Sequence, residues 1–397
     1  MIFSRNNRIG MALCVMFTLT SVNLPTLAYP PDPDNAALLY YQAFLTVPKD
    51  EEPADNQLRD YADGKIELNK AIEDYVQSCR RAIGLAVAAS ELRQCDWGLR
   101  YSQGFDMLLS HLGQIRGLAH ILIANARIQA SKGNYELALE QCLTTLGISR
   151  HIGDETLVSF LVAVAAENMT GDCIADLLGQ IPADSRLPEQ LKAELAALAK
   201  RPLSAAKSLD LEREVASEQM RMERIGDFMR AMAIDPSKSE EQVLQDVQKL
   251  GGRVYLKKSR DYYTKYMDSI VSIIQSGSPY AKTYQKLAEI TDKPGNDQKK
   301  RPEAMLTAAL APGVSKIYGG MVRGRTQANA LRAAVDIYIS MAKTGQLPNG
   351  LPSGLPKDLF SGKDFEYKKT KAGFTLRCRG KDLDKDKVQE YEFKVSK

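Results

Sequence analysis

The chain has 397 residues, of which 44% are hydrophobic and 26% charged, and its formal net charge is +4. This small charge excludes a protein that binds polyanions through its overall charge. The length suggests two or three domains and is ample for a sizeable hydrophobic core.

The N-terminal residues have the order of a secretory signal peptide. Arg5 and Arg8 form a basic head, residues 9–22 carry no charge, and Thr26-Leu27-Ala28 is a small-x-small cleavage pattern. We therefore predict a signal peptide over residues 1–28 and export to the periplasm or cell envelope. The alternative is an uncleaved membrane anchor, although the apolar run is shorter than the roughly 20 residues that span a bilayer.

Helical periodicity dominates the sequence from residue 35 to residue 343. Apolar residues three and four positions apart predict helices at 35–44, with Asp34 as N-cap, and at 66–92, 106–129, 136–151, 154–180, 255–274 and 325–343. Residues 189–251 are also helical in pattern but more charged. The most apolar stretch, 157–166, is too short to cross a membrane and predicts a buried helix.

One turn between predicted helices resembles a tetratricopeptide-type hairpin. Gly133-Asn134-Tyr135, followed by Ala138, provides the glycine turn and the aromatic residue that let two helices pack antiparallel. Such repeats form a solenoid only when about three of them stack, and the sequence has one good copy. We predict an isolated hairpin within an irregular helical domain.

The C-terminal part changes character. Residues 291–301 are polar, charged and contain Pro and Gly, which is typical of a linker. Short strands are predicted at 365–368, 374–378 and 390–395. The predicted fold class is therefore mainly α: an irregular multi-helix domain over 29–290, the linker, and a small α+β module over 302–397 with one helix and a short antiparallel sheet.

Two blocks of sequence resemble a known set of proteins. The first is Cys95-Asp96-Trp97-Gly98-Leu99 with Leu108 to Leu112 and Arg150-His151. The second consists of Ala333-Ala334, Ile337-Tyr338, Gly345 to Pro348, Asp358 to Lys363, Tyr367, Gly373-Phe374 and Leu376. Both are similar to uncharacterised exported helical proteins of planctomycete-type bacteria. The second block is also similar to the globular head of type II secretion pseudopilins.

This resemblance implies an exported helical protein with a pseudopilin-like C-terminal module, and it implies no particular activity. The chain departs from pseudopilins at the prepilin signal. Gly10 is followed by an apolar run in which Val15 stands where a glutamate guides filament assembly. We therefore expect the head module without incorporation into a filament.

Five cysteines follow the predicted leader: Cys79, Cys95, Cys142, Cys173 and Cys378. Export permits disulfides, and the odd number leaves at least one thiol without an intrachain partner. Cys79 and Cys95 are the nearest pair and the candidate disulfide. The alternative is that all five are buried as small apolar residues.

A candidate calcium loop lies near the C-terminus. Asp382, Asp384 and Asp386 alternate, and Glu390 follows. The EF-hand glycine and its bidentate glutamate are replaced by Lys387 and Phe393, and lysines interrupt the carboxylates. A solvated hairpin turn is the alternative interpretation.

Two other patterns are candidates for chemistry. His111 and His120 lie on nearly opposite faces of one predicted helix, and His151 could approach His120 as a ligand pair or an acid–base pair. Residues 319–326 have the spacing of a phosphate loop, but Arg325 stands where the lysine belongs. A glycine-rich entry to a helix is the alternative.

The predicted function is that of a non-enzymatic scaffold or interaction protein that holds a protein partner in the envelope. GxSxG and HExxH motifs are absent, so no catalytic residue and no cofactor are predicted. Two alternatives stay open: an envelope hydrolase in which acidic residues meet His120 or His151, and a peripheral binder of anionic membrane or polysaccharide through the basic, tyrosine-rich residues 249–301. Export makes nucleic acid an unexpected partner.

Overall fold

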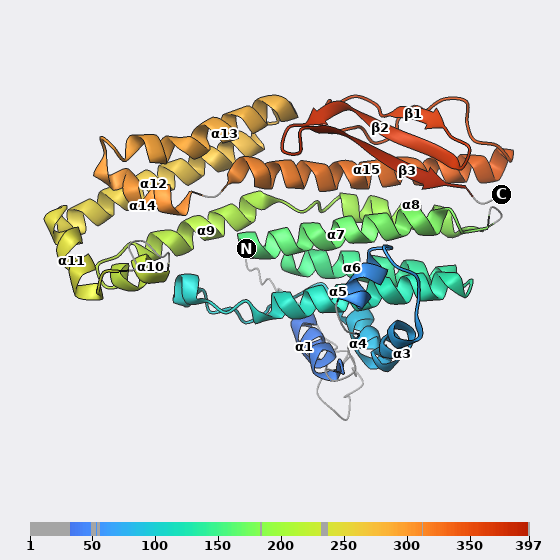
Figure 1. Cartoon of the computed structure of the whole chain (residues 1–397), viewed down its shortest axis with the longest axis horizontal. Helices are drawn as coiled ribbons and strands as arrows, with labels where there is room; N and C mark the ends of the chain where they lie inside the picture. Colours follow the sequence, from blue (N-terminus) through green and yellow to red (C-terminus); the bar gives the residue numbers. More distant parts are fainter. Residues whose placement is uncertain are drawn as a thin grey trace, which may run out of the picture. The chain divides into compact units, whose positions relative to one another are not determined.

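The computed structural model describes residues 32–48, 53, 56–182, 185–231, 237–311 and 313–395. The predicted signal peptide at residues 1–28 lies outside the described residues. Asn35–Lys397 forms one compact unit. It is mainly helical and ends in a three-stranded antiparallel sheet (Figure 1), which confirms the predicted fold class.

The first part of the unit consists of short helices packed against a long one. These are α1 (Ala36–Thr46), α2 (Gln57–Ala62), α3 (Lys70–Ser78) and α4 (Arg80–Glu91), followed by a 3₁₀ turn (Tyr101–Asp106) and α5 (Ser110–Ser131). Two sequence predictions need correction here. Asn35, not Asp34, caps α1 by accepting a hydrogen bond from the Ala37 amide. The predicted helix at 66–92 is two helices that meet at Cys79.

The predicted hairpin is present. After α5 the chain turns within three residues into α6 (Tyr135–Ile152), and the two helices pack against each other. Gly133 has a φ of +81°, a conformation that L side chains rarely adopt, so a glycine is needed at this turn. The α5–α6 hairpin therefore lies within the irregular helical body.

Helix α7 (Leu157–Leu178) forms the core of that body. Among the described helices it has the length and apolarity to cross a membrane, but half of its most apolar window is buried within the protein. It contacts α5 and α6 on one side and α15 on the other. Its apolar side chains thus pack within the protein, in agreement with the buried helix predicted at 157–166.

The middle of the chain forms a second set of helices. They are α8 (Leu187–Ala199), α9 (Ala205–Gln219), α10 (Ile225–Ala231), α11 (Glu240–Lys249), α12 (Gly252–Gln275), α13 (Tyr280–Asp297) and α14 (Met305–Leu310), with a 3₁₀ turn at Pro302–Ala304. The linker predicted at 291–301 needs correction, because α13 continues to Asp297. Pro294 lies inside that helix and is buried, so packing overrides its helix-breaking tendency.

Helix α15 (Val314–Thr344) organises the C-terminal half. It begins eleven residues before the predicted helix at 325–343 and ends at Gly345, whose φ of +73° provides a left-handed C-cap. The sheet and α13 contact one side of α15, and α7 and α8 contact the other (Figure 1). The chain therefore does not separate into a helical body and an independent C-terminal module.

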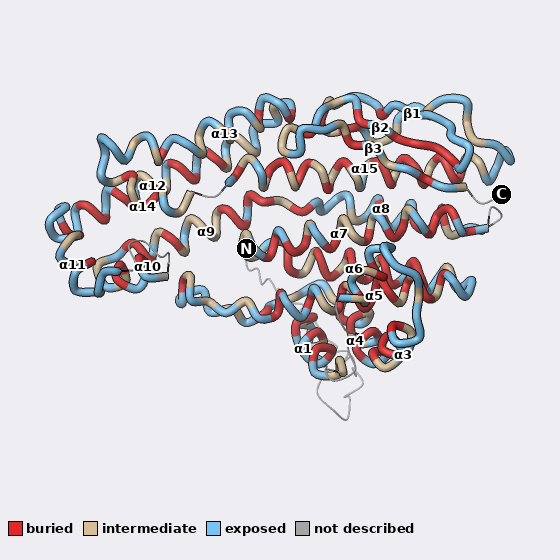
Figure 2. Tube along the Cα trace, in the orientation of Figure 1, coloured by how far each residue is buried: buried red, intermediate tan, exposed pale blue. Residues whose placement is uncertain are grey.

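The sheet has the order β1-β2-β3, with β1 at Glu366–Lys369, β2 at Gly373–Asp382 and β3 at Lys387–Lys394. Phe374 is fully buried, and its ring stacks on Phe393 at 5.2 Å and lies 5.6 Å from Tyr338 of α15. Alternation along β2 and β3 thus places one apolar face on α15. Figure 2 shows the resulting buried faces of α15 and α7 and the exposed outer side of α13.

The loop before the sheet is fixed by one buried carboxylate. Asp358 accepts hydrogen bonds from the Phe360 amide, the Ser361 hydroxyl and the amides of Arg379 and Gly380. These bonds hold the loop against β2. They give the Asp358–Lys363 block, one of those that carried the family resemblance, a structural role.

Candidate anion-binding pocket

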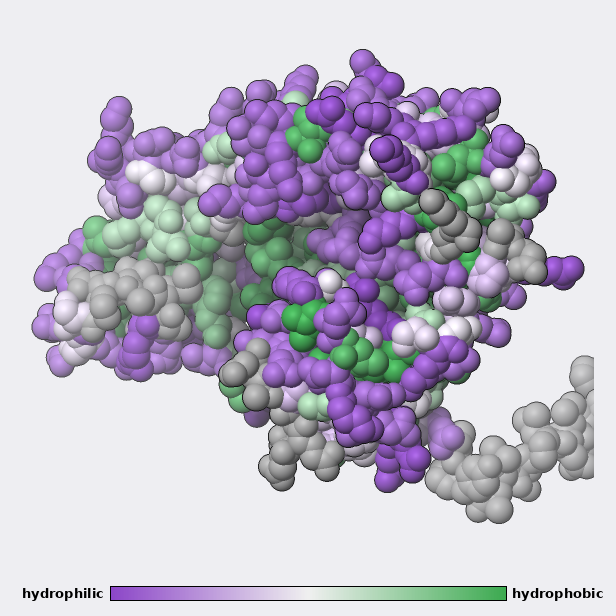
Figure 3. Space-filling view, turned by 45° about the vertical axis from the view of Figure 1, so that its right-hand side comes forward, coloured by the Kyte–Doolittle hydropathy of each residue, from purple (hydrophilic) through white to green (hydrophobic). Residues whose placement is uncertain are grey.

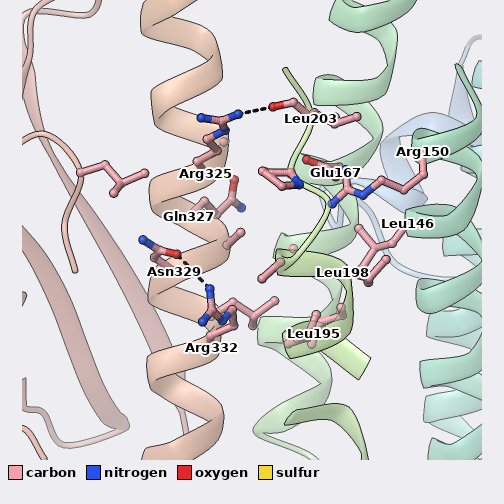
Figure 4. Close-up of a pocket in the computed structure, with 18 residues that line it drawn as sticks. Leu146, Arg150, Glu167, Leu195, Leu198, Leu203, Arg325, Gln327, Asn329 and Arg332 are labelled. Atoms are coloured by element: carbon pink, nitrogen blue, oxygen red, sulfur yellow. Dashed lines mark hydrogen bonds and ion pairs between the residues drawn. The ribbon is translucent and has the colours of Figure 1, made fainter. Parts of the chain in front are cut away.

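A cavity of about 260 Å³ lies between α6, α7, α8 and α15 (Figure 4). Its walls are mainly apolar, and its leucine and isoleucine residues are Leu146, Ile174, Leu195, Leu198, Leu203, Leu331 and Leu359. The face of the molecule seen in Figure 3 is largely hydrophilic, and hydrophobic residues gather there in a hollowed zone. An apolar recess with few polar groups is the usual form of a small-ligand site.

Glycines allow α7 and α15 to approach closely beside this cavity. A Cβ on Gly324 would lie 2.9 Å from the Asn168 side-chain oxygen, and one on Gly171 would lie 3.2 Å from the Gln327 amide nitrogen. Gln327 also donates to Asp172 at 2.6 Å. The two helices are thus fixed relative to each other.

The first charged feature of the pocket is an ion pair between neighbouring helices. Arg150, in the last turn of α6, contacts the carboxylate of Glu167 on α7. Burial raises the pKa of Glu167, and the guanidinium of Arg150 opposes that rise. Arg150 thereby supplies the counter-charge that a carboxylate at this depth requires.

Arg325 on α15 has no such partner. One of its terminal nitrogens donates to the Leu203 carbonyl, while its Nε is buried without a hydrogen-bond partner. Within the described residues no carboxylate comes within ion-pair distance of Arg325, and the nearby Glu167 is held by Arg150. Burial lowers the pKa of Arg325, yet a guanidinium stays protonated at any physiological pH.

A second guanidinium lies two helical turns further along α15. Arg332 is about 10 Å from Arg325 along the helix axis, and its described hydrogen bond is to the Asn329 side chain at 3.3 Å. Figure 4 shows Arg325, Gln327, Asn329 and Arg332 along the α15 wall of the pocket. Three arginines and one glutamate line the cavity, so its lining has an excess of positive charge.

This arrangement is suited to binding rather than to proton transfer. The leucines would surround an apolar group, and the guanidiniums would donate to a planar anion such as a carboxylate, for which their fork geometry is matched. Sequence reasoning missed these residues. In the sequence, Arg325 stands out only as the residue at the lysine position of a phosphate-loop pattern. The feature that could have predicted its role is an arginine on the apolar face of a long helix.

The phosphate-loop interpretation of residues 319–326 needs correction. These residues lie inside α15, so neither a loop nor a helix entry is present. The glycines instead permit close contacts: a Cβ on Gly319 would lie 2.8 Å from the Cβ of Asp384. Tertiary packing therefore accounts for the glycine spacing.

The four residues of the candidate calcium loop are distributed among protein cations. Asp382 and Asp384 both bind Arg323, at 2.6 and 2.5 Å, Asp386 binds Lys381, and Glu390 lies 3.9 Å from Arg377. In the part of the chain that the structure describes, no group of three or more His, Cys, Asp or Glu side chains could hold a metal ion. The region is a hairpin turn between β2 and β3.

The three histidines have separate surroundings. His151 hydrogen-bonds to the Tyr40 hydroxyl and the Leu92 carbonyl, both at 2.9 Å, and burial lowers its pKa. His120 shares a surface cavity with Arg59 and Arg116. The ligand or acid–base pair of His120 with His151 is therefore not assembled.

The sequence predicts no partner for His111. It is buried, its ring stacks on Trp97 at 4.6 Å, and its Nε2 lies 3.6 Å from Glu155. Trp97 also donates to the His151 carbonyl and stacks on Tyr40. These contacts anchor the 93–109 segment and α1 to α5 and α6. They give a structural role to Trp97 and His111, which belong to the sequence blocks that carried the resemblance.

The predicted disulfide between Cys79 and Cys95 is opposed by the helix between them. Cys79 is buried immediately before α4, and Cys95 follows its end. A twelve-residue helix is about 18 Å long, whereas the Cα atoms of a disulfide lie about 5.5–6 Å apart. The Ala36 amide also binds the Gln94 carbonyl, which holds the Cys95 segment at the start of α1.

The basic residues 249–301 form the outer side of α12 and α13. Tyr255, Tyr263, Tyr266 and Tyr280 are buried, and Tyr262 donates to Asp297 at 2.7 Å. The tyrosines thus belong mainly to the helix packing. Lysines remain exposed there, as on a solvated helix face.

Comparison with known protein families, with curated proteins and with solved structures finds no significant match to this chain. The function is therefore argued from the pocket itself.

Proposed function

We propose that this chain is an exported, non-enzymatic helical binding protein of the periplasm or cell envelope, and that its pocket binds an anion with an apolar body. The observation that carries the proposal is Arg325, a largely buried guanidinium with no carboxylate partner among the described residues. An uncompensated buried charge costs several kcal/mol. An anionic ligand would recover part of that cost. The pocket should therefore bind an anion more tightly than a neutral or cationic molecule of the same size.

The volume and lining indicate the class of ligand. An engineered apolar cavity of about 150 Å³ binds benzene. A cavity of about 260 Å³ therefore has room for about ten non-hydrogen atoms. A medium-chain or aryl carboxylate has this size, with the carboxylate at Arg325 and the apolar part among Leu195, Leu198 and Leu331.

Octanoate is a suitable probe because it has ten non-hydrogen atoms. We expect calorimetric titration of the purified chain to show saturable octanoate binding, with 1-octanol and octylammonium binding at least about 10-fold more weakly, as expected for a hydrogen-bonded charge pair. The variant Arg325→Leu should weaken octanoate binding by the same factor. Arg377→Leu, which removes an exposed arginine from β2, is the matched control and should bind like the unmodified chain.

Two outcomes would contradict the binding proposal. Equal affinity for octanoate and 1-octanol would show that charge plays no part in recognition. Undiminished binding by a folded Arg325→Leu protein would place the ligand elsewhere.

Export is a separate part of the proposal and has its own measurement. The basic head, apolar run and cleavage pattern support a mature N-terminus at Tyr29. Mass spectrometry of the protein recovered from an envelope fraction should show that N-terminus. An intact leader on protein confined to the cytosol would contradict it.

The resemblance to pseudopilin heads remains part of this proposal. A long helix, α15, followed by an antiparallel three-stranded sheet packed on it supports the similarity. In this chain the opposite side of the same helix lines the pocket, so we propose that the module here contributes to ligand binding.

A further inference from the structure

Two cysteines that are 31 residues apart in the sequence meet in the core. Cys142 of α6 and Cys173 of α7 have their sulfur atoms 3.8 Å apart, and both side chains are fully buried. Because α6 and α7 are consecutive helices packed against each other, the contact is held by the hairpin between them. The other cysteines of the described residues are placed differently: Cys79 and Cys95 stand on either side of α4, and Cys378 lies in β2.

We propose that Cys142 and Cys173 form a disulfide when the chain folds after export, and that this bond is the native covalent link between α6 and α7. A disulfide needs sulfurs at about 2.05 Å, so the atoms in contact at 3.8 Å require a short approach rather than a rearrangement of the helices. An oxidising compartment allows such bonds to form and persist.

The reaction needs an oxidant, and a protein or small-molecule disulfide is the class that an envelope provides. One cysteine thiolate attacks this disulfide, forms a mixed disulfide and releases one thiol. The second cysteine then attacks the mixed disulfide, closes the Cys142–Cys173 bond and releases the other thiol. Two electrons pass to the oxidant, and the two protein thiol protons balance the two thiols that it releases.

Burial sets the time at which this reaction occurs. Neither sulfur is exposed in the folded protein, so a bulky oxidant reaches them only while α6 and α7 are still assembling. Once closed, the bond would be shielded from reductants in the same way. This predicts a structural bridge that persists rather than one that opens and closes.

The bridge would also support the pocket. Leu146 and Arg150 follow Cys142 on α6, while Glu167 and Ile174 flank Cys173 on α7, and all four line the cavity. A bond between the helices would fix the distance that the Arg150–Glu167 ion pair spans. The bond does not depend on the ligand, and its test is independent of binding.

Peptide mapping tests the proposal directly. The full chain is refolded in a buffer of reduced and oxidised glutathione, alkylated under denaturing conditions and digested with trypsin. Trypsin cleaves after Arg150, so Cys142 lies in peptide 133–150 and Cys173 in peptide 151–186. We expect these two peptides to be recovered joined, and to separate on reduction.

Two variants give the matched comparison. Cys142→Ser should abolish the joined species and leave Cys173 alkylated, whereas Cys378→Ser should leave the joined species unchanged. Recovery of peptides 133–150 and 151–186 in alkylated, separate form from the oxidised protein would overturn the proposal. A link between peptides 71–80 and 94–100, which contain Cys79 and Cys95, in place of the expected one would also overturn it.

Discussion

Arg323 and Arg325 stand two residues apart on α15, and the helix directs them to opposite sides. Residues two positions apart are about 200° apart around an α-helix. Arg323 meets the β2–β3 turn, where it binds Asp382 and Asp384. Arg325 meets the cavity between α7 and α8, where it donates to a backbone carbonyl.

The difference in partners gives the two guanidiniums different roles. Burial would lower the pKa of Arg323, but Asp382 and Asp384 raise it above its usual value. Burial lowers the pKa of Arg325, and nearby Glu167 does not offset this effect. Arg323 is thus a completed structural contact, because carboxylates neutralise its charge. Arg325 is an incomplete contact, because it has no carboxylate partner, and an anionic ligand could provide one.

The largest expected effect is the loss of the completed contact. Arg323→Ala would leave the fully buried Asp382 without its cation. Removing one partner of a buried pair destabilises a protein by about 3–5 kcal/mol. Urea unfolding followed by circular dichroism should show that decrease in the free energy of unfolding.

A double variant separates charge from packing in this contact. Arg323→Leu with Asp382→Leu removes the guanidinium and the fully buried carboxylate and leaves Asp384 with Lys385, 3.9 Å away. Replacing a buried pair by apolar residues is often neutral. We expect the double variant to be more stable than Arg323→Ala. If Arg323→Ala cost less than about 1 kcal/mol, the range of a surface pair, the contact would not hold the sheet on α15.

The next effect is on pH dependence. Burial would raise the pKa of Asp382, but hydrogen bonds from Arg323 and Gln389 hold it below its usual value. A lowered pKa in the folded state gives stability that is present above the unfolded value, about 3.9 for Asp, and is lost as the pH falls through the folded value. Asp382→Asn should therefore be less stable than the unmodified chain at neutral pH, and the difference should shrink below about pH 4 in urea titrations. A difference that stayed constant with pH would show that the Asp382 charge does not contribute.

The fold was largely predictable because its signals are local. Three- and four-residue spacing gave the helices, and Gly133 and Gly345 ended them where their positive φ angles require glycine. Boundaries were missed where packing overrides local preference. The helix α13 continues through Pro294, and α15 begins well before the apolar periodicity becomes clear.

The candidate site could not be predicted because it combines distant segments. Arg150, Glu167, Leu203 and Arg325 come from different parts of the chain, and no local spacing relates them. The same limit applies to the cysteines. Proximity in sequence predicted a disulfide between Cys79 and Cys95, but a helix separates them, whereas the packing of α6 on α7 brings Cys142 and Cys173 into contact. Local motifs such as Asp382-x-Asp384-x-Asp386 were visible, yet their partner Arg323 was not.

The incomplete contact should respond in affinity more than in stability. Arg325→Leu removes an unpaired buried charge and one hydrogen bond, effects of opposite sign, so we expect the free energy of unfolding to fall by no more than about 1 kcal/mol. Octanoate affinity should fall at least about 10-fold. Calorimetry and urea unfolding on the same preparation measure both quantities. A stability loss as large as that of Arg323→Ala would mean that Arg325 is a structural contact after all.

The smallest effect is expected at Arg332. Its side chain is partly exposed and donates to Asn329, whereas the Nε of Arg325 is buried without a hydrogen-bond partner; the charge of Arg332 is therefore better solvated. Exposed ion pairs contribute about 0.2–1 kcal/mol, and Arg332→Leu should therefore weaken octanoate binding by no more than about 5-fold. This loss should diminish in titrations at high salt, where exposed charges are screened, while the larger loss in Arg325→Leu should persist because a buried charge is screened much less. Reversal of this order would place the carboxylate at Arg332, with the apolar part of the ligand directed toward Arg325.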